Sequence, residues 1–215
     1  MNIVITGTAQ GIGLALAEKF LREGHRVFGF DIRESPITHP QFRHIRQDIR
    51  AESFPPLPEP EILINNAGTL EERDAIDVNL TATIRFTEHF LDSAALRSVL
   101  FIASASARNG AEFPMYVASK AGIVGYMKNL ALSAAKRGIT CNSISPGGVV
   151  TPANRHILED ERLYAAVKAE TLLGKWAEAE EIADLAYYLT VVNRSITGED
   201  ILIDNGEMLK SNFIW

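Results

Sequence analysis

The chain has a single cysteine, Cys141, which excludes a disulfide framework and a cysteine-rich metal site. Its neighbours in the sequence are mostly apolar, so a small buried side chain is the favoured interpretation. Histidines are also few and show no metal-ligand spacing, which indicates surface or packing roles for His25, His39, His44, His89 and His156. We therefore expect no metal centre.

Runs of positive charge and long apolar runs are missing as well. The formal net charge is −6 and no cluster of Lys or Arg appears, which argues against nucleic acid or an anionic membrane as the main partner. No apolar stretch reaches the length of a transmembrane helix, and the chain enters a strand pattern at Asn2 without a signal peptide. We expect a soluble, cytoplasmic protein.

Short β-branched runs alternate with longer helical patterns along the whole chain. With 215 residues, 47% of them hydrophobic, the chain can form a substantial core. This order predicts an α/β fold, a single domain over 1–215 with a doubly wound, Rossmann-like parallel sheet and helices on both faces. Strands are expected at 2–6, 26–30, 42–46, 62–65, 98–103, 140–144 and 201–203, and helices at 11–23, 75–93, 116–137 and 177–189.

A glycine-rich turn follows the first predicted strand. Glycines between a strand and an amphipathic helix let the backbone approach a pyrophosphate, which the amides at the helix N-terminus can bind. Taken alone, such a turn is equally consistent with a structural role. As a dinucleotide site, it would use Gly7, Thr8, Gln10, Gly11, Ile12 and Gly13.

Asp31 ends the second predicted strand, eighteen residues after Gly13. A carboxylate there accepts hydrogen bonds from the adenosine ribose and repels a 2′-phosphate, so Asp31 and the adjacent Ile32 favour NAD over NADP. A solvated carboxylate is the alternative for Asp31. Arg33 is the nearby residue that could hold a phosphate.

Two further segments end strands at the same edge, where ligands of parallel sheets bind. Asp48 and Ile49 would meet the adenine amino group and one face of its ring, although a loop residue and a core residue are the simpler interpretation. Asn66, Ala67 and Gly68 combine small side chains with amide donors, which suits close approach of a ligand. An asparagine-rich turn is the alternative for this second segment.

Tyr116 and Lys120 lie four residues apart and so share one face of the predicted helix. A tyrosine has a pKa of about 10 and needs a shift of roughly 3 units to ionise near neutrality, which an adjacent lysine charge supplies in part. The pair predicts a general base that takes a proton from an alcohol. The same spacing also occurs by chance in many helices.

In this order the segments resemble the short-chain dehydrogenase/reductase family, in its shorter NAD(P)-dependent form. The resemblance also rests on Asn79, Ser104, the run 146–151 and the run 204–206, and it covers nearly the whole chain. Ser106 is an alternative to Ser104. We prefer Ser104 because it directly follows the predicted strand.

The resemblance implies roles for four catalytic residues. Tyr116 would be the acid/base, and Lys120 would bind the nicotinamide ribose and lower the pKa of Tyr116. Ser104 would hydrogen-bond the substrate oxygen, and Asn79 would anchor a water that passes protons from Lys120 toward solvent. The nicotinamide would be covered by Pro146, Gly147, Val149 and Thr151.

The chain is short for this family. Few residues separate Gly68 from Asn79, and a proline-rich connection at 55–60 takes the place of a helix. Loops at 105–115 and 152–171 are expected to line the substrate pocket, the second as part of a lid within about 151–175. The apolar tail 212–215 would dock on its own domain or on a neighbouring subunit.

We therefore expect an oxidoreductase that transfers a hydride between NAD(H) and a secondary alcohol or ketone. The resemblance further implies a homodimer or homotetramer that pairs the helices at 75–93 and 116–137. One alternative is an NADPH-dependent carbonyl or oxoacyl reductase that uses Arg33. The other is a non-catalytic NAD-binding regulatory protein, which has no need of the tyrosine base.

Overall fold

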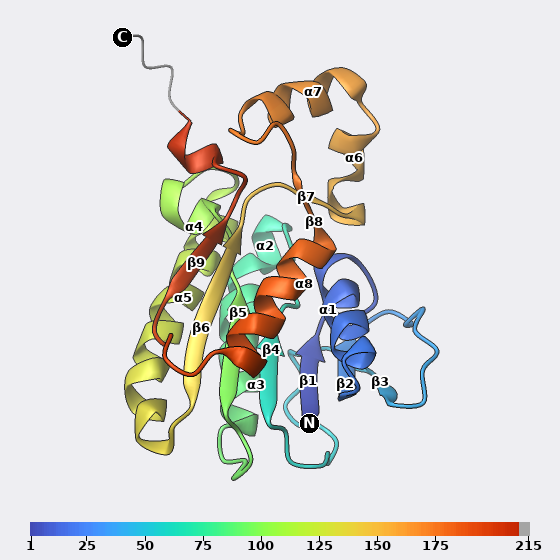
Figure 1. Ribbon diagram of the computed structural model, residues 1–215, viewed down its shortest axis with the longest axis vertical. Helices are drawn as coiled ribbons and strands as arrows, with labels where there is room; N and C mark the ends of the chain where they lie inside the picture. The colour runs from blue at the N-terminus through green and yellow to red at the C-terminus, as the bar shows by residue number, and fades with distance from the viewer. Residues whose placement is uncertain (211–215) are drawn as a thin grey trace.

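The structure is a computed structural model that describes residues 1–210, and it contains a seven-stranded parallel sheet (Figure 1). The strand order is β3-β2-β1-β4-β5-β6-β9, so the direction of winding reverses between β1 and β4. The crevice at such a reversal is where open α/β sheets bind ligands. The predicted fold class is confirmed. The predicted docking of the tail 212–215 lies outside the described residues.

All seven predicted strands are present, with small differences at their ends. Relative to the prediction, β2 and β6 extend further and β5 ends one residue earlier. The strands are β1 Asn2–Thr6, β2 Arg26–Asp31, β3 Phe42–Arg46, β4 Ile62–Asn65, β5 Ser98–Ile102, β6 Thr140–Pro146 and β9 Asp200–Ile203. A second, two-stranded sheet, which was not predicted, joins β7 Val149–Val150 to β8 Ala177–Glu178. Strands this short carry no periodic pattern in the sequence.

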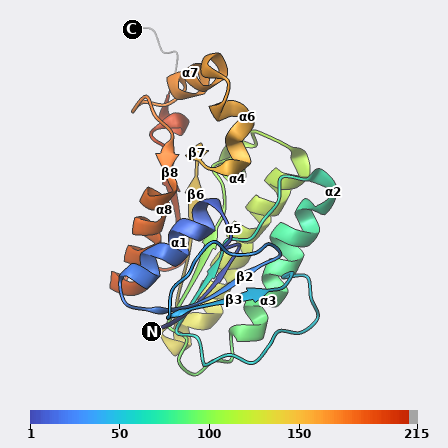
Figure 2. The same ribbon diagram turned by 90° about the vertical axis from the view of Figure 1, so that its right-hand side faces the viewer.

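Helices cover both faces of the sheet. Figure 2 shows α1 (Gly11–Arg22) and α8 (Ala179–Tyr187) on one side, and α3 (Thr83–Phe90) and α5 (Pro114–Ala134) on the other. The helix predicted at 75–93 is composite, because α2 (Glu72–Ala75) leads into a π-helical segment, η1, before α3. A π-helix breaks the 3.6-residue period that the prediction relied on. The remaining short helical segments are η1 Ile76–Ala82, α4 Ser106–Asn109, η2 Ala135–Arg137, η4 Tyr188–Val192 and η5 Glu207–Leu209.

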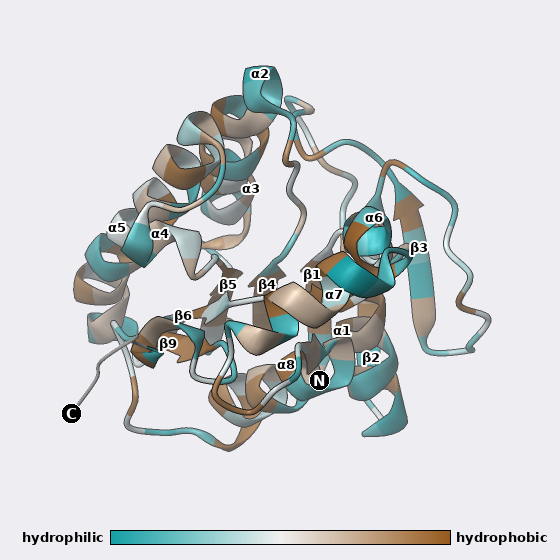
Figure 3. Ribbon diagram, turned by 90° about the horizontal axis from the view of Figure 1, so that it is seen from above, coloured by the Kyte–Doolittle hydropathy of each residue, from teal (hydrophilic) through white to brown (hydrophobic). Residues whose placement is uncertain are grey.

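Alternate residues of the central strands face opposite helix layers. Ile3 and Ile5 of β1 pack with the residues of α1 and α8, whereas Val4 belongs to the core that contains Phe86 and Met127. Figure 3, seen from above, shows the apolar strands between the two helix layers. Because both faces of the sheet are covered, its carboxyl edge is the accessible place for a ligand.

The segment predicted as a mobile lid is largely helical. It contains η3 (Pro152–Asn154), α6 (Arg155–Leu158) and α7 (Glu161–Ala169), which lie above the carboxyl ends of the strands in Figure 1. Asp160 caps α7 by accepting a hydrogen bond from the Leu163 amide at 2.9 Å. Within residues 1–210, no helix is both long and apolar enough to cross a membrane.

Cys141 lies within β6 and is fully buried. Burial raises the pKa of its thiol to about 12, and the thiolate is the reactive form. We expect no release of thiolate from a chromogenic disulfide reagent at pH 8 in the folded protein, and one equivalent after denaturation. Fast release of one equivalent from the folded protein would show that β6 opens readily.

Candidate active site

The glycine turn joins β1 to α1 at the carboxyl edge of the sheet. Gly7 and Gly11 adopt φ values of 77° and 56°, in the left-handed region that favours glycine. A Cβ on Gly13 would lie 1.9 Å from the carbonyl oxygen of Gly7, so α1 begins directly against the turn. Within residues 1–210, no side chain caps the N-terminus of α1. Its first amides are thus available to an anion such as a pyrophosphate.

Asn66 holds this turn in place. Its side-chain Nδ2 donates to the carbonyl oxygens of Thr6 at 3.0 Å and Gly7 at 3.2 Å. In return, Thr6 Oγ1 accepts from the amides of Asn66 at 2.9 Å and Ala67 at 3.0 Å. The side-chain amide donor that we expected to face a ligand is therefore used inside the protein. Asn66 supports a cofactor by shaping the turn.

The adenosine end of the site carries both signs of charge. The Asp31 carboxylate accepts from the Ala9 amide and from the Arg33 amide, each at 2.9 Å. Each carboxylate oxygen keeps a lone pair for a ribose hydroxyl. The Arg33 guanidinium hydrogen-bonds Gln10, so a positive charge lies beside the glycine turn. Ile32 is 60% exposed and offers an apolar surface to an adenine ring.

Asp48 and Ile49 already have partners within the protein, which makes them less available to an adenine than the sequence suggested. Arg50 Nη2 lies 2.7 Å from Asp48 Oδ2, and this contact lowers the pKa of Asp48. Ile49 is buried in the core beneath α3. An adenine amino group would therefore share the Asp48 carboxylate with Arg50, and Ile49 has the core role named as its simpler interpretation.

Ser104 and Tyr116 meet just beyond the end of β5. Tyr116 lies in the first turn of α5, and the buried Ser104 side chain is near enough to lower the pKa of its phenol. Of the two candidate serines, Ser104 is the one that acts on the pKa of the tyrosine. Ser106 bonds Ser104 instead, at 2.8 Å between the two Oγ atoms.

The electrostatics of the pair differ from the sequence prediction. Burial raises the pKa of Tyr116 to about 12, although the nearby Ser104 side chain acts in the opposite direction. Lys120 is buried; its Nζ donates to the Ile102 carbonyl at 2.9 Å and lies 5.7 Å from the centroid of the Tyr116 ring. Burial also lowers the pKa of Lys120 to about 8. In this structure the expected lowering of the Tyr116 pKa by Lys120 is absent, and burial of the phenol has the largest effect on that pKa.

Asn79 lies in the π-helical η1 and holds the segment that follows β4. Its Oδ1 accepts from the Thr69 amide at 2.7 Å, and its Nδ2 donates to Thr69 O at 2.9 Å and Ser119 Oγ at 3.1 Å. A Cβ on Gly68 would lie 3.0 Å from Asn79 Oδ1 and 3.6 Å from Lys120 Nζ. Asn79, Gly68 and Lys120 therefore lie close together. Ser119 was missed, and only its position next to Lys120 could have indicated it.

The run 146–151 leads from β6 back toward the glycine turn. The Gly147 amide donates to the Ile203 carbonyl at 3.0 Å. A Cβ on Gly148 would lie 2.2 Å from the Trp176 ring, so this glycine permits close packing of the indole. At the far end of the run, a Cβ on Gly11 would lie 3.4 Å from Thr151. No pattern in the sequence indicated Trp176, since its contact depends on a distant glycine.

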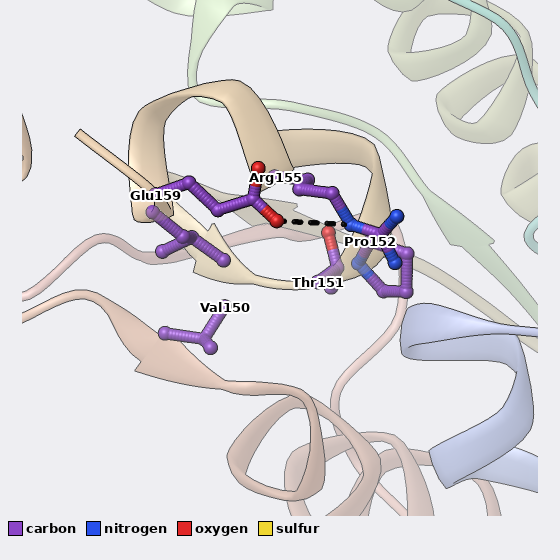
Figure 4. Close-up of a pocket in the computed structure, with 6 residues that line it drawn as sticks. Val150, Thr151, Pro152, Arg155 and Glu159 are labelled. Carbon is purple, nitrogen blue, oxygen red and sulfur yellow. Dashed lines mark ion pairs between the residues drawn. The ribbon is translucent and has the colours of Figure 1, made fainter.

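A cavity of about 340 Å³ lies between this run and α6 (Figure 4). Arg155 Nε and Glu159 Oε1 form an ion pair at 3.6 Å across one turn of the chain. The cavity joins the predicted nicotinamide run to the predicted lid. Its lining residues are Val150, Thr151, Pro152, Arg155, Leu158 and Glu159.

The arrangement can bind an oxygen and move a proton. The hydroxyls of Ser104 and Tyr116 form a pair that can hold a carbonyl or alcohol oxygen, and the buried Lys120 lies beside them. None of these side chains carries a hydride, so redox chemistry requires a bound cofactor. Within residues 1–210, no group of three His, Cys, Asp or Glu side chains could hold a metal ion. The fold and site define a dinucleotide-dependent oxidoreductase.

Comparisons with known proteins agree with this class. A sequence profile described as "Enoyl-(Acyl carrier protein) reductase" matches residues 61–207. The short chain dehydrogenase adrF of Penicillium roqueforti is 30% identical over 94% of this chain and 95% of its own length. The 3-oxoacyl-[acyl-carrier-protein] reductase FabG of Salmonella typhimurium is 29% identical over the same shares of the two chains. The chain belongs to the short-chain dehydrogenase/reductase family.

Solved structures show the same relationship. A structure described as 4-hydroxyisoleucine dehydrogenase complexed with NADH superposes with a TM-score of 0.86 and is 27% identical. The alignment covers 98% of this chain and 99% of that one. The short connections at 47–61 and 69–78 thus leave the family fold intact.

Proposed function

We propose that the protein interconverts a secondary alcohol and a ketone by hydride transfer with NAD(H), using Tyr116 as the acid/base. The observation that carries this proposal is that Ser104 and Tyr116 lie together at the end of β5 beside the buried Lys120, whose Nζ is 5.7 Å from the centroid of the Tyr116 ring. The pair lies at the same edge of the sheet as the glycine turn. A substrate oxygen held there would have its reacting carbon near a nicotinamide.

The proton steps follow from the protonation states of these residues. A bound nicotinamide cofactor supplies the hydride chemistry. As the carbinol carbon loses its hydride, its hydroxyl becomes acidic and Tyr116 in its phenolate form takes the proton; in the reverse direction the Tyr116 phenol donates it. With a pKa of about 12, Tyr116 is protonated at neutral pH and ready to donate. Lys120, with a pKa of about 8, can release or accept a proton near neutrality.

Several residues fit a dinucleotide. A Cβ on Gly7 would lie 2.7 Å from Asn66 Nδ2 and one on Gly13 would meet a backbone oxygen, so only glycine leaves this cradle open to a pyrophosphate. Asp31 and Ile32 would hold the adenosine. Asp31 supports NAD, as does the NADH named for the 4-hydroxyisoleucine dehydrogenase structure. Arg33, the raised pKa of Tyr116 and the likeness to FabG support the second candidate, an NADPH-dependent oxoacyl reductase.

A fluorescence titration with NADH and NADPH tests the choice of cofactor. We expect tighter binding of NADH by the parent protein. Asp31→Asn should shift the preference toward NADPH by about 10-fold, since a hydrogen bond to a charged group contributes about 1.5–3 kcal/mol. Arg33→Ala is the matched variant and should leave NADH binding unchanged. Tighter NADPH binding by the parent, lost in Arg33→Ala, would instead favour the reductase.

We also propose a cytoplasmic homodimer or homotetramer that acts on a small alcohol or ketone. Leu132 on α5, one of the helices expected to pair, is 78% exposed in the single chain. A subunit contact through α5 would remove this side chain from water. Light scattering that gives the mass of a monomer at micromolar concentration would refute this assembly.

A further inference from the structure

The positive charge of Arg155 does little to stabilise the helix that carries it. Arg155 is the first residue of α6, and the partial positive charge of a helix N-terminus disfavours a cation. Its partner Glu159 lies four residues later, whereas the favourable order on a helix places the acidic residue first. The placement of this guanidinium is therefore explained better by a ligand than by the helix.

The ion pair that Arg155 forms is weak and can be exchanged. Arg155 Nε lies 3.6 Å from Glu159 Oε1, which is longer than the roughly 2.8 Å of a charge-assisted hydrogen bond. The two side chains are 71% and 72% exposed, so water and salt screen their attraction. The guanidinium can leave Glu159 at little cost when a stronger anion is bound nearby.

The cavity that Arg155 lines is adjacent to the glycine turn. Thr151 lines the same cavity, and a Cβ on Gly11 would lie 3.4 Å from Thr151 Cβ. Since α1 begins at Gly11, its first turn meets the wall of the cavity at Thr151. In Figure 4 the guanidinium of Arg155 lies next to Pro152, on the side where the pale blue ribbon of α1 passes. A ligand on the first amides of α1 would therefore lie at the mouth of the cavity that Arg155 lines.

The glycine turn offers partial charges but no full positive charge. None of the residues from Thr6 to Gly13 is a Lys or an Arg, so backbone amides and the N-terminus of α1 provide its attraction for an anion. Arg33 contacts Gln10 at the adenosine end of the site. A pyrophosphate is dianionic, and a guanidinium binds two phosphate oxygens through its planar fork of donors. Arg155 would supply the missing charge from the side of the lid.

We propose that Arg155 is a cofactor-binding residue of the lid: when a dinucleotide binds, its guanidinium exchanges Glu159 for the pyrophosphate. This inference rests on the proposed function and adds to it a residue, Arg155, that holds the lid to the cofactor. Glu159 competes with the cofactor for the guanidinium, so it weakens cofactor binding in the parent protein. The contact involves neither the nicotinamide nor the substrate, so it acts on any ligand that carries the pyrophosphate.

The test is the dissociation constant of NADH, measured by fluorescence, and that of ADP, measured by calorimetry. ADP carries two phosphates without the nicotinamide. Arg155→Ala should weaken the binding of both by about 5- to 10-fold, between the effect of an exposed ion pair and that of a hydrogen bond to a charged group. Added salt should weaken NADH binding less in Arg155→Ala than in the parent, because one screened attraction is gone. Arg155→Lys keeps the charge and should recover part of the affinity.

Two matched variants distinguish this contact from a general effect of charge. Glu159→Gln removes the competing carboxylate and should tighten NADH binding about 2-fold, but only while Arg155 is present. Combined with Arg155→Ala, it should therefore have no further effect. Arg162→Ala removes the same charge from α7, at a residue that does not line the cavity, and should leave both dissociation constants unchanged.

The outcomes separate this inference from the proposed function. An Arg155→Ala protein that binds NADH and ADP as the parent does overturns the role of Arg155 and leaves Tyr116 as the acid/base; a raised KM for an anionic substrate would then assign Arg155 to the substrate. Equal losses in Arg155→Ala and Arg162→Ala would reflect only the charge of the lid and also overturn it. A parent protein that binds NADH without turnover refutes the proposed function, while the predicted losses in Arg155→Ala would still support the inference. A parent that binds neither ligand refutes both.

Discussion

Replacing Tyr116 with phenylalanine lowers kcat by about 10²- to 10⁴-fold in both directions, the range that general acid–base catalysis contributes. The phenyl ring keeps its place beside Lys120 and only the hydroxyl next to Ser104 is lost. Cofactor affinity should therefore stay within about 5-fold of the parent, since one net hydrogen bond is worth roughly 1 kcal/mol. Turnover of a panel of secondary alcohols and ketones, with a parallel NADH titration, measures both quantities.

Tyr126 provides the matched control for this substitution. It also lies on α5, burial raises its pKa to about 12, and its ring packs against Phe101 at 5.9 Å between centroids. Tyr126→Phe removes the same atom from the same helix without touching Ser104 or Lys120, so we expect parental kcat. Equal turnover by Tyr116→Phe and the parent would refute the catalytic assignment. Cofactor binding without turnover in the parent would favour the regulatory alternative.

Substitution of Gly13 by alanine should abolish cofactor binding. The added Cβ would lie 1.9 Å from Gly7 O and 2.5 Å from Asn66 Nδ2. Gly7 cannot move away freely, because its amide donates to Phe30 O at 2.7 Å. The turn and the first turn of α1 must therefore separate. We expect no saturable change in NADH fluorescence and a loss of about 1–3 kcal/mol in the free energy of unfolding, as for overpacked cores.

Gly125 is the matched position for this second experiment. It lies inside α5, and a Cβ there would have no described atom within 4 Å. Gly125→Ala should leave NADH binding unchanged and raise the free energy of unfolding by about 0.5–1 kcal/mol, since alanine favours the helix over glycine. Urea titrations of both variants provide the two values. Parental NADH affinity in Gly13→Ala would show that the turn can open without losing its ligand.

The sequence indicated the sheet well because parallel strands covered on both faces are continuous apolar runs. The central strands β1, β4 and β5 are such runs, whereas the edge strand β3 holds only two apolar residues, Phe42 and Ile45. The sequence did not indicate the helices of the predicted lid, because α6 has only four residues and α7 only nine. The π-helical η1, which carries Asn79, was also missed, because its period differs from that of an α-helix.

In the candidate site, too, some features could be predicted from the sequence and others could not. The sequence by itself determined whatever depends on neighbours along the chain: the glycine turn before α1, and Tyr116 and Lys120 on one face of α5. The tertiary structure alone decided how these groups are charged and held. Lys120 donates a hydrogen bond to the Ile102 carbonyl, eighteen positions away. The Asn66 side-chain amide donates to carbonyl oxygens of residues about sixty positions away. Burial by other elements raises the pKa of Tyr116, and pKa values and hydrogen-bond partners depend on contacts that no local pattern encodes.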